Sequence, residues 1–203
     1  PAYYLVKLPL FVDCVESGDT IACPGDTGYS TIPLFGKTVR LRKDSQPIQL
    51  MGCLDELSNL AHGFRLQGDA LVARVSSIVV GLAVQLNAYM VQGSDERLGK
   101  VITVEKALES LVAENCRGRE ARLGWIMPTT QRGVAVDSLR VKLRQCGRIA
   151  SSMVEEYGEK AANVMMILNQ ADKIAAQLLY CMGEGKVFKS VDDLTAQLLR
   201  EAL

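Results

Sequence analysis

Two adjacent stretches in the second half of the chain repeat apolar residues at spacings that alternate between three and four without interruption. This spacing places the repeated residues on one face of an α-helix and predicts long helices over residues 134–157 and 160–182. Helices with such seams pack antiparallel at shallow angles, as they do in bundles. The first seam is Val136, Leu139, Leu143, Cys146, Ala150 and Met153, and the second is Ala161, Val164, Leu168, Ala171, Ala175, Leu178 and Met182.

Three more helices are predicted before these two, and a short one after them. Apolar residues at helical spacing predict a helix over residues 53–66, and residues 71–91 are apolar on most sides, which is typical of a central bundle helix. Thr103 is expected to cap the next helix, and Ser190, followed by Asp193, to cap the last. The fold class is therefore predicted to be all-α, with five main helices in a bundle.

Residues 1–50 differ from the rest because they contain five of the six prolines. Proline lacks a backbone N–H donor and interrupts helices. We therefore expect an irregular, partly extended N-terminal arm, with an extended piece at Tyr3–Val12 and loops after it. The helical bundle is expected over residues 51–203, within a single domain overall.

Charge and hydropathy exclude several classes of partner. The 203 residues include 23 basic and 23 acidic side chains, so the formal net charge is zero, which argues against a broadly basic nucleic-acid surface. The longest uncharged run, residues 75–94, contains Ser, Gln, Asn and Gly, so we expect no membrane span. The N-terminus shows no secretion-signal pattern.

The six cysteines and the single histidine, His62, lack the spacing of a zinc site. A Cys/His nucleophilic pair has no better support. The simplest interpretation is reduced cysteines that pack as small apolar groups in a cytoplasmic protein.

Two stretches have residue types that suit an anionic ligand. Glycines in Gly25-Asp26-Thr27-Gly28-Tyr29-Ser30-Thr31 let backbone N–H groups approach a phosphate, although the same pattern is common in turns. Arg140, Arg144 and Arg148 recur every four residues and share a helix face. They form either a phosphate-binding ridge or a solvated basic stripe.

Two further stretches each allow two interpretations. The acidic residues of Gly52-Cys53-Leu54-Asp55-Glu56-Leu57-Ser58-Asn59 suit the positive end of a helix, unless Asp55 pairs with an arginine. Trp125, which precedes Ile126-Met127-Pro128, is either a core or an interface anchor.

Taken in order, these stretches resemble the motifs of the PduO-type ATP:cob(I)alamin adenosyltransferases. In that family a glycine-rich stretch precedes a Lys-Asp pair, here Lys43-Asp44, and then Gly-Thr-Leu-Asp-Glu-Leu-Asn-Ser. An aromatic-Ile-Leu-Pro segment and an arginine helix of the form Arg-x-x-x-Arg-Arg-Ala-Glu-Arg follow. The resemblance covers residues 20–182.

The resemblance implies a five-helix bundle that forms a homotrimer with ATP and the corrinoid at its subunit interfaces. The implied reaction moves the adenosyl group of ATP to the cobalt of reduced cobalamin. A reductase would supply the electron that reduces the cobalt. Arg140 would pair with the neighbouring subunit's Asp55, Arg144 would bind the triphosphate together with Mg²⁺, and Trp125 would lie against the lower corrinoid face. Asp172 matches the end of the family's Leu-Asn-Arg-Leu-Ser-Asp stretch and is implied as a cofactor-binding residue. The residues implied to wrap the nucleotide are Gly25, Asp26, Gly28, Ser30, Thr31 and Lys43.

The chain departs from the family pattern at several positions. It has Ala22-Cys23-Pro24 where the family has Thr-Arg-Thr, and Gln145 and Gly147 replace an arginine and a glutamate. Asn169 stands one position later than the family's asparagine, and the arginine after it is missing. These departures favour an alternative, a non-catalytic nucleotide- or corrinoid-binding paralogue. A purely structural trimer is a third interpretation.

Overall fold

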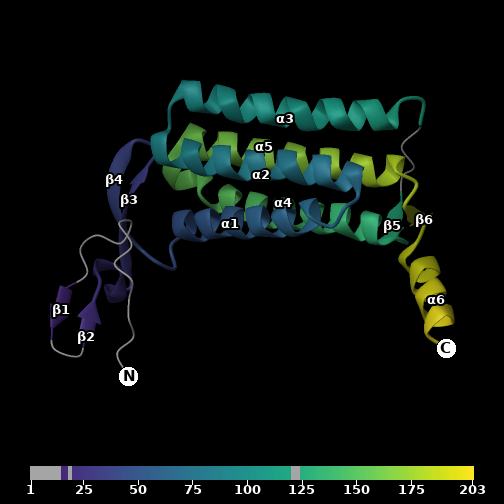
Figure 1. Ribbon diagram of the computed structural model, residues 1–203, viewed down its shortest axis with the longest axis horizontal. Coiled ribbons are helices and arrows are strands. Elements are labelled where there is room, and N and C mark those ends of the chain that lie inside the picture. Colours follow the sequence, from purple (N-terminus) through teal and green to yellow (C-terminus); the bar gives the residue numbers. More distant parts are fainter. Residues whose placement is uncertain (1–14, 18–19, 120–123) are drawn as a thin grey trace.

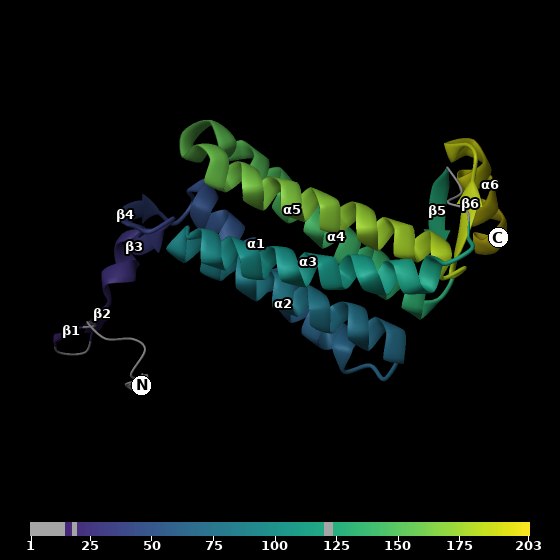
Figure 2. The same cartoon turned by 90° about the horizontal axis from the view of Figure 1, so that it is seen from above.

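Five long helices form the body of the molecule in the computed structural model, which describes residues 15–17, 20–119 and 124–203. They lie side by side (Figures 1 and 2), with α1 in contact with α2 and α4, and α5 in contact with α3 and α4. The prediction of a mostly helical chain is confirmed. The helices are α1 (Gln46–Arg65), α2 (Ala70–Gln92), α3 (Asp95–Cys116), α4 (Gln131–Ser152) and α5 (Val154–Cys181), followed by the shorter α6 (Val191–Ala202).

Helices α1, α3, α4 and α5 all begin several residues earlier than the sequence pattern predicts, and the boundary between α4 and α5 lies at Met153, ahead of the predicted boundary at residues 157–160. Helix α1 begins before residue 53 because Pro47 occupies its first turn, where the missing N–H has no partner to lose. Helix α3 is capped by Ser94, whose side chain accepts a hydrogen bond from a backbone N–H in the first turn, so Thr103 lies inside the helix and not at its start. The predicted start of α6 is confirmed, since the Ser190 hydroxyl accepts a hydrogen bond from the Asp193 backbone N–H.

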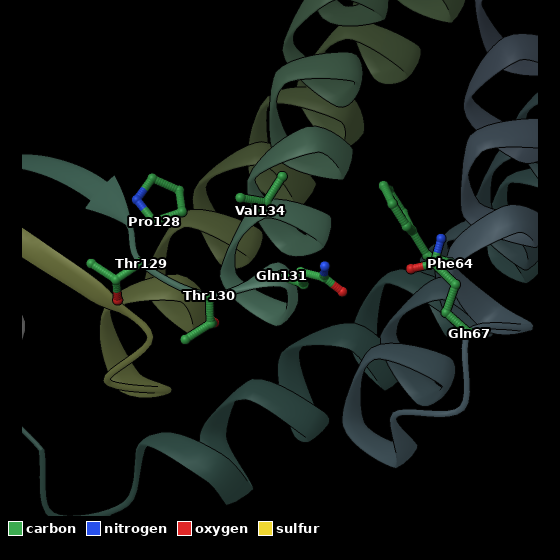
Figure 3. Close-up of a pocket in the computed structure, with 7 residues that line it drawn as sticks. All are labelled: Phe64, Gln67, Pro128, Thr129, Thr130, Gln131 and Val134. Atoms are coloured by element: carbon green, nitrogen blue, oxygen red, sulfur yellow. The ribbon is translucent and has the colours of Figure 1, made fainter. Parts of the chain in front are cut away.

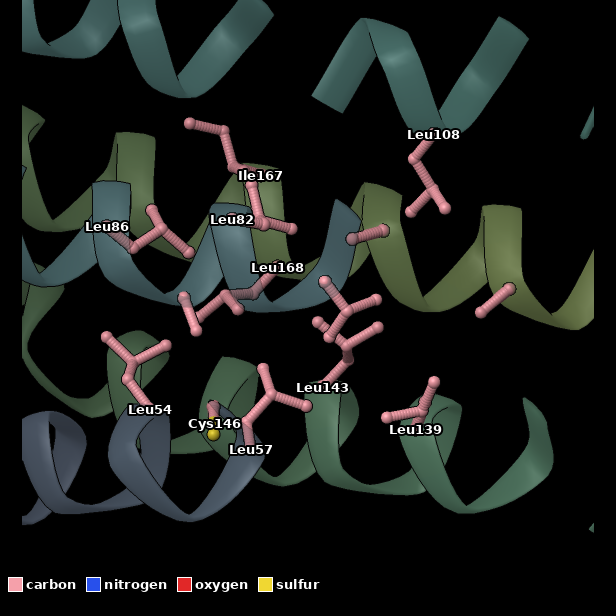
Figure 4. Packing of buried hydrophobic residues seen from close by; sticks show 14 of the residues in the cluster. Leu54, Leu57, Leu82, Leu86, Leu108, Leu139, Leu143, Cys146, Ile167 and Leu168 are labelled. Carbon is pink, nitrogen blue, oxygen red and sulfur yellow. The ribbon is translucent and has the colours of Figure 1, made fainter. Parts of the chain in front are cut away.

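The two apolar seams form the centre of the bundle. Every residue of the first seam is fully buried, and so is every residue of the second except Met182, which is half-buried. Figure 4 shows Leu82, Leu143 and Leu168, from three different helices, converging on one interior. Each such leucine contributes about 1.5–3 kcal/mol relative to an exposed position, so the seams and the facing residues of α1, α2 and α3 together stabilise the bundle.

Helix α2 is the one described helix that is long and apolar enough to cross a membrane by length and composition alone, with a mean hydropathy of 1.6. Core helices of globular proteins pass the same test, and α2 packs between α1 and α3. Its buried face includes Val75, Val79, Leu82 and Leu86.

Three two-stranded antiparallel sheets in the described residues occupy segments that the sequence pattern did not predict as strands. They pair β1 (Val15–Ser17) with β2 (Thr20–Ala22), β3 (Tyr29–Leu34) with β4 (Lys37–Arg42), and β5 (Trp125–Pro128) with β6 (Gly185–Phe188). The turn between β3 and β4 has positive φ at both Phe35 and Gly36, which is the geometry that two-residue hairpins need. The extended piece expected at Tyr3–Val12 lies outside the described residues.

The prediction of reduced cysteines is wrong. Cys53 of α1 is disulfide-bonded to Cys146 of α4, and Cys116 of α3 to Cys181 of α5. Cys23 is also in a disulfide. The expected burial of the four bundle cysteines is confirmed, but packing brings their Cα atoms within 5.6 and 5.0 Å in the two pairs, a separation that permits a cross-link. Partners 93 and 65 residues apart leave no local sequence signal.

Candidate functional site

The glycine-rich stretch folds into a short 3-10 helix, η1 (Pro24–Thr27), directly before β3. The Asp26 carboxylate accepts a hydrogen bond of 2.7 Å from the Cys23 backbone N–H and so holds the turn closed. Gly28 ends the turn at a φ of 77°, a left-handed conformation that side chains disfavour. Asp26 and Gly28 therefore shape the backbone of this loop.

Lys43 lies against the same loop. Its backbone N–H donates to the Gly28 carbonyl at 2.9 Å. Its ammonium nitrogen is 3.3 Å from the point that a Cβ atom on Gly25 would occupy. A side chain at residue 25 would therefore crowd the ammonium group, and the structure brings Gly25, Gly28 and Lys43 together.

The hairpin next to this loop adds a second cation. The Arg40 guanidinium of β4 lies over the Tyr29 ring, 4.4 Å from its centre. Arg40 is paired in register with Thr31 of β3, which is exposed, whereas Ser30 is half-buried. Sequence analysis missed Arg40 because only the strand register shows that it lies beside the loop residues.

Arg140, the first arginine of the ridge formed by Arg140, Arg144 and Arg148 on α4, is already paired within its own chain. Its Nε donates to the Asp137 carboxylate at 2.7 Å, and its Nη1 is 3.7 Å from a carboxylate oxygen of Asp172 on α5. Arg140 and Asp172 are both mostly buried, with side chains 21% and 15% exposed. The spacing of Asp137 and Arg140, three residues apart on a helix, is a signal that the sequence offered and that was missed.

Asp172 lies beside the whole arginine ridge. Burial raises the pKa of its carboxyl above the usual value, and the positive charges of Arg140, Arg144, Lys173 and Arg148 oppose this rise. In the described part of the chain, Arg144 and Arg148 are exposed and have no hydrogen-bonded partner, so they are available to an anion.

Asn169 of α5 fills the space above Gly147 of α4. A Cβ atom at residue 147 would lie only 2.9 Å from the Asn169 Oδ1 atom. The two departures from the family pattern therefore belong together, because a glutamate at residue 147 would have to displace the Asn169 amide.

Asp55 and Arg140 have different partners within one chain. The exposed Asp55 carboxylate accepts a hydrogen bond of 3.0 Å from the Asn87 amide of α2. The next residue, Glu56, forms an ion pair with Lys142, which connects α1 to α4. An Asp55–Arg140 pair would therefore have to form between subunits, and it stays a prediction.

Trp125 begins β5 and is 56% exposed. The strand leads through Pro128 into an open cleft of about 740 Å³ at the start of α4. Figure 3 shows Phe64 of α1 and Gln67, in the turn after α1, on one side of this cleft, facing Gln131 and Val134 of α4 on the other. Sequence reasoning had no signal for the cleft, because its two walls lie about 60 residues apart and meet only through the α1–α4 packing.

Comparisons with solved structures identify the fold. The chain is similar to a phenylalanine-to-alanine and a phenylalanine-to-histidine variant of a PduO-type ATP:corrinoid adenosyltransferase from Lactobacillus reuteri, both complexed with cobalamin and ATP. For each the TM-score is 0.62 and the identity 18% over 82% of this chain, with 97% and 95% of the other chain covered. An arginine-to-lysine variant complexed with ATP gives a TM-score of 0.57 at 14% identity, over 82% of this chain and 97% of that one.

A scan against protein-family models finds no match, and no curated protein sequence is significantly similar. The fold is therefore that of the PduO-type adenosyltransferases, which supports the family suggested by the sequence motifs.

Proposed function

We propose that this protein transfers the 5′-deoxyadenosyl group of ATP to the cobalt of reduced cobalamin and releases triphosphate. The observation that carries the proposal is the contact between the Lys43 ammonium group and the turn at Gly25, beside the left-handed Gly28. A cation and exposed backbone at one point suit a phosphate chain. The shared fold with adenosyltransferases solved with ATP and cobalamin supports the same reaction.

The reaction is a nucleophilic substitution at the ribose 5′ carbon. The electron pair of cobalt(I) forms the cobalt–carbon bond, while the C5′–O bond breaks and its electron pair leaves with triphosphate, so cobalt becomes cobalt(III). No proton moves, so the chain needs no general base. Its residues have to orient the two substrates and offset the charge on the leaving triphosphate, which are the roles of Lys43, Arg144 and Arg148.

Mg²⁺ fits this site as part of the nucleotide. The described residues contain no group of three His, Cys, Asp or Glu side chains that could hold a metal ion. Mg²⁺ is commonly bound by substrate phosphates and water with few protein ligands, where it neutralises charge on the phosphates. Asp172, next to the arginine ridge, would orient such a complex.

A homotrimer would complete the site. Strands β3 and β4, which follow the glycine loop, project beyond one end of the bundle (Figure 1), whereas the arginine ridge runs along α4. The loop of one subunit would therefore meet the exposed Arg144 and Arg148 of the next, and Asp55 would reach the neighbour's Arg140. Cobalamin would bind at the cleft, with Trp125 against the lower face of its ring.

A non-catalytic nucleotide- or corrinoid-binding protein is the second candidate. The observation that favours it is the Asn169 amide above Gly147, which occupies the space that the family's acidic side chain would enter and would have to move to admit it. The Ala22-Cys23-Pro24 segment also lacks the hydroxyls and the cation of the family's Thr-Arg-Thr.

Anaerobic incubation with ATP, Mg²⁺ and reduced cobalamin distinguishes these candidates. Transfer produces the absorbance change of an alkylcobalt bond together with free triphosphate. Binding of ATP or cobalamin without this change selects the second candidate. A melting temperature that neither ligand raises at saturation would leave only a structural role, since a bound ligand stabilises the folded state.

The Lys43→Ala variant tests the observation behind the proposal. It is expected to weaken ATP binding, because it removes the cation at the glycine loop. Lys37→Ala is the matched control, since Lys37 is an exposed lysine on the same hairpin, at the start of β4. Equal ATP affinity in the two variants would refute the assignment of Lys43.

A further inference from the structure

Arg132, in the first turn of α4, joins segments from three parts of the chain. Its Nε is 3.0 Å from a carboxylate oxygen of Asp69, an ion-pair contact without the alignment of a hydrogen bond. Its Nη1 is 3.4 Å from a carboxylate oxygen of Glu184, in the segment between α5 and β6. The Glu184 and Asp69 side chains are only 20% and 31% exposed, so both carboxylates are partly sheltered from water.

Glu184 in turn fastens the connection between β5 and α4. Its carboxylate accepts a hydrogen bond of 2.6 Å from the Thr130 hydroxyl, and its carbonyl accepts one of 2.8 Å from the Thr129 backbone N–H. A Cβ atom on Gly133 would lie only 2.7 Å from that carbonyl oxygen, so a glycine is required for this close packing. Thr129 and Thr130 both line the cleft.

Asp69 lies close in the sequence to the opposite wall of the cleft. It follows Gln67, which lines that wall, by two residues. Its carboxylate also caps α2 by accepting a hydrogen bond of 2.9 Å from the Val72 backbone N–H. The Arg132–Asp69 contact therefore connects the start of α4, on one side of the cleft, to the segment that follows α1 on the other side.

From this arrangement we infer that Arg132 sets the width of the cleft and is a positioning residue for its corrinoid substrate. The inference rests on the proposed function and adds a residue that lies in none of the motifs shared with the adenosyltransferases. The guanidinium fork holds both carboxylates at once, which a lysine ammonium on its flexible stem does not do. The Asp69–Arg132–Glu184 group thus adds a polar link between the two walls, beside the α1–α4 packing and the Cys53–Cys146 disulfide.

The experiment measures the affinity of the 203-residue chain for cob(II)alamin at saturating ATP by visible absorbance, together with its affinity for ATP. The variants are Arg132→Ala and Asp69→Asn. Asparagine caps a helix as well as aspartate does, so Asp69→Asn removes the charge and keeps the start of α2. Arg74→Ala is the matched control, because Arg74 forms an arginine–carboxylate bridge with Glu114 between α2 and α3, outside the cleft.

Both cleft variants are expected to weaken cobalamin binding by at least about tenfold, because small displacements of a binding wall have large effects. ATP affinity and the turnover at saturating cobalamin should stay unchanged, so that the loss appears in KM and not in kcat. The double variant should lose no more than the single variants, since both remove the same contact. Arg74→Ala should bind cobalamin as the unmodified chain does.

Cobalamin affinity that is unchanged in Arg132→Ala and Asp69→Asn overturns the inference alone. A loss of the same size in Arg74→Ala also overturns it, because that result points to general destabilisation. If the unmodified chain binds no cobalamin, the proposed function fails and this inference fails with it.

Discussion

The disulfide between α1 and α4 gives the most quantitative prediction. Replacing Cys53 and Cys146 together by alanine removes a cross-link between residues 93 positions apart. A cross-link of this span reduces the entropy of the unfolded chain, and its loss is expected to lower the free energy of unfolding by about 4.6 kcal/mol. Most domains have a total of about 5–15 kcal/mol, so the variant should be close to unfolding.

The same reasoning predicts a change in the denatured state. The two cysteines are almost fully buried, at 4% and 0% exposure, so alanine leaves only a small void in the folded bundle. Without the cross-link the unfolded chain expands and exposes more surface, so the slope of unfolding free energy against denaturant concentration should increase. A loss caused by poorer native packing alone would leave this slope unchanged.

Equilibrium unfolding in guanidinium chloride, without reductant and at one fixed protein concentration, measures both quantities. The fixed concentration matters because assembly contributes to apparent stability. The control is the paired replacement of Cys116 and Cys181, which lie 65 residues apart and should give a similar loss of about 4.3 kcal/mol.

A loss below about 2 kcal/mol for the Cys53/Cys146 variant, the lower end for such cross-links, would refute the entropic reasoning. Labelling of Cys53 or Cys146 by a thiol reagent in the unfolded, unreduced protein would refute the disulfide itself.

Three further predictions concern single residues. Burial, and secondarily Glu109, raises the pKa of Glu105 above its ordinary 4.5, so the charged carboxylate lowers stability as pH rises through that raised value. Glu105→Gln should therefore melt higher than the unmodified chain at pH 7 and alike at pH 4, and a constant difference across this range would contradict the assignment. Asp55→Ala should abolish trimer formation or turnover. It should lower the free energy of unfolding of the single chain by no more than about 1 kcal/mol, because Asp55 is exposed and Arg140 keeps its partners within the chain. Unchanged mass by light scattering with unchanged activity would reject the Asp55–Arg140 pair. Trp125→Ala should leave the melting temperature unchanged, since the ring is 56% exposed. It should reduce the amount of bound cob(II)alamin that has lost its lower ligand, measured by the absorbance spectrum of that species. An unaltered spectrum would rule out contact between Trp125 and the corrinoid.

The helices are the part of this protein that its sequence by itself determined. A helix is stabilised by contacts three and four residues apart, so the seam through Leu139 and Leu143 and the cap at Ser190 are visible without a structure. The order of the glycine stretch, Lys43 and the arginine helix likewise indicates the adenosyltransferase fold from the sequence alone. Thr103 shows the limit of local signals, because Ser94 caps the helix and Thr103 lies inside it.

Only the tertiary structure decided which distant residues meet. The Cys53–Cys146 bond, the pairing of β5 with β6 and the Arg132–Asp69 contact join positions that no periodicity relates. Such contacts depend on the register with which whole helices pack, and a shift of one residue along a helix turns a side chain by about 100°. The physical reason is that packing energy is summed over many side chains, so the identity of one residue does not indicate which distant residue it will contact.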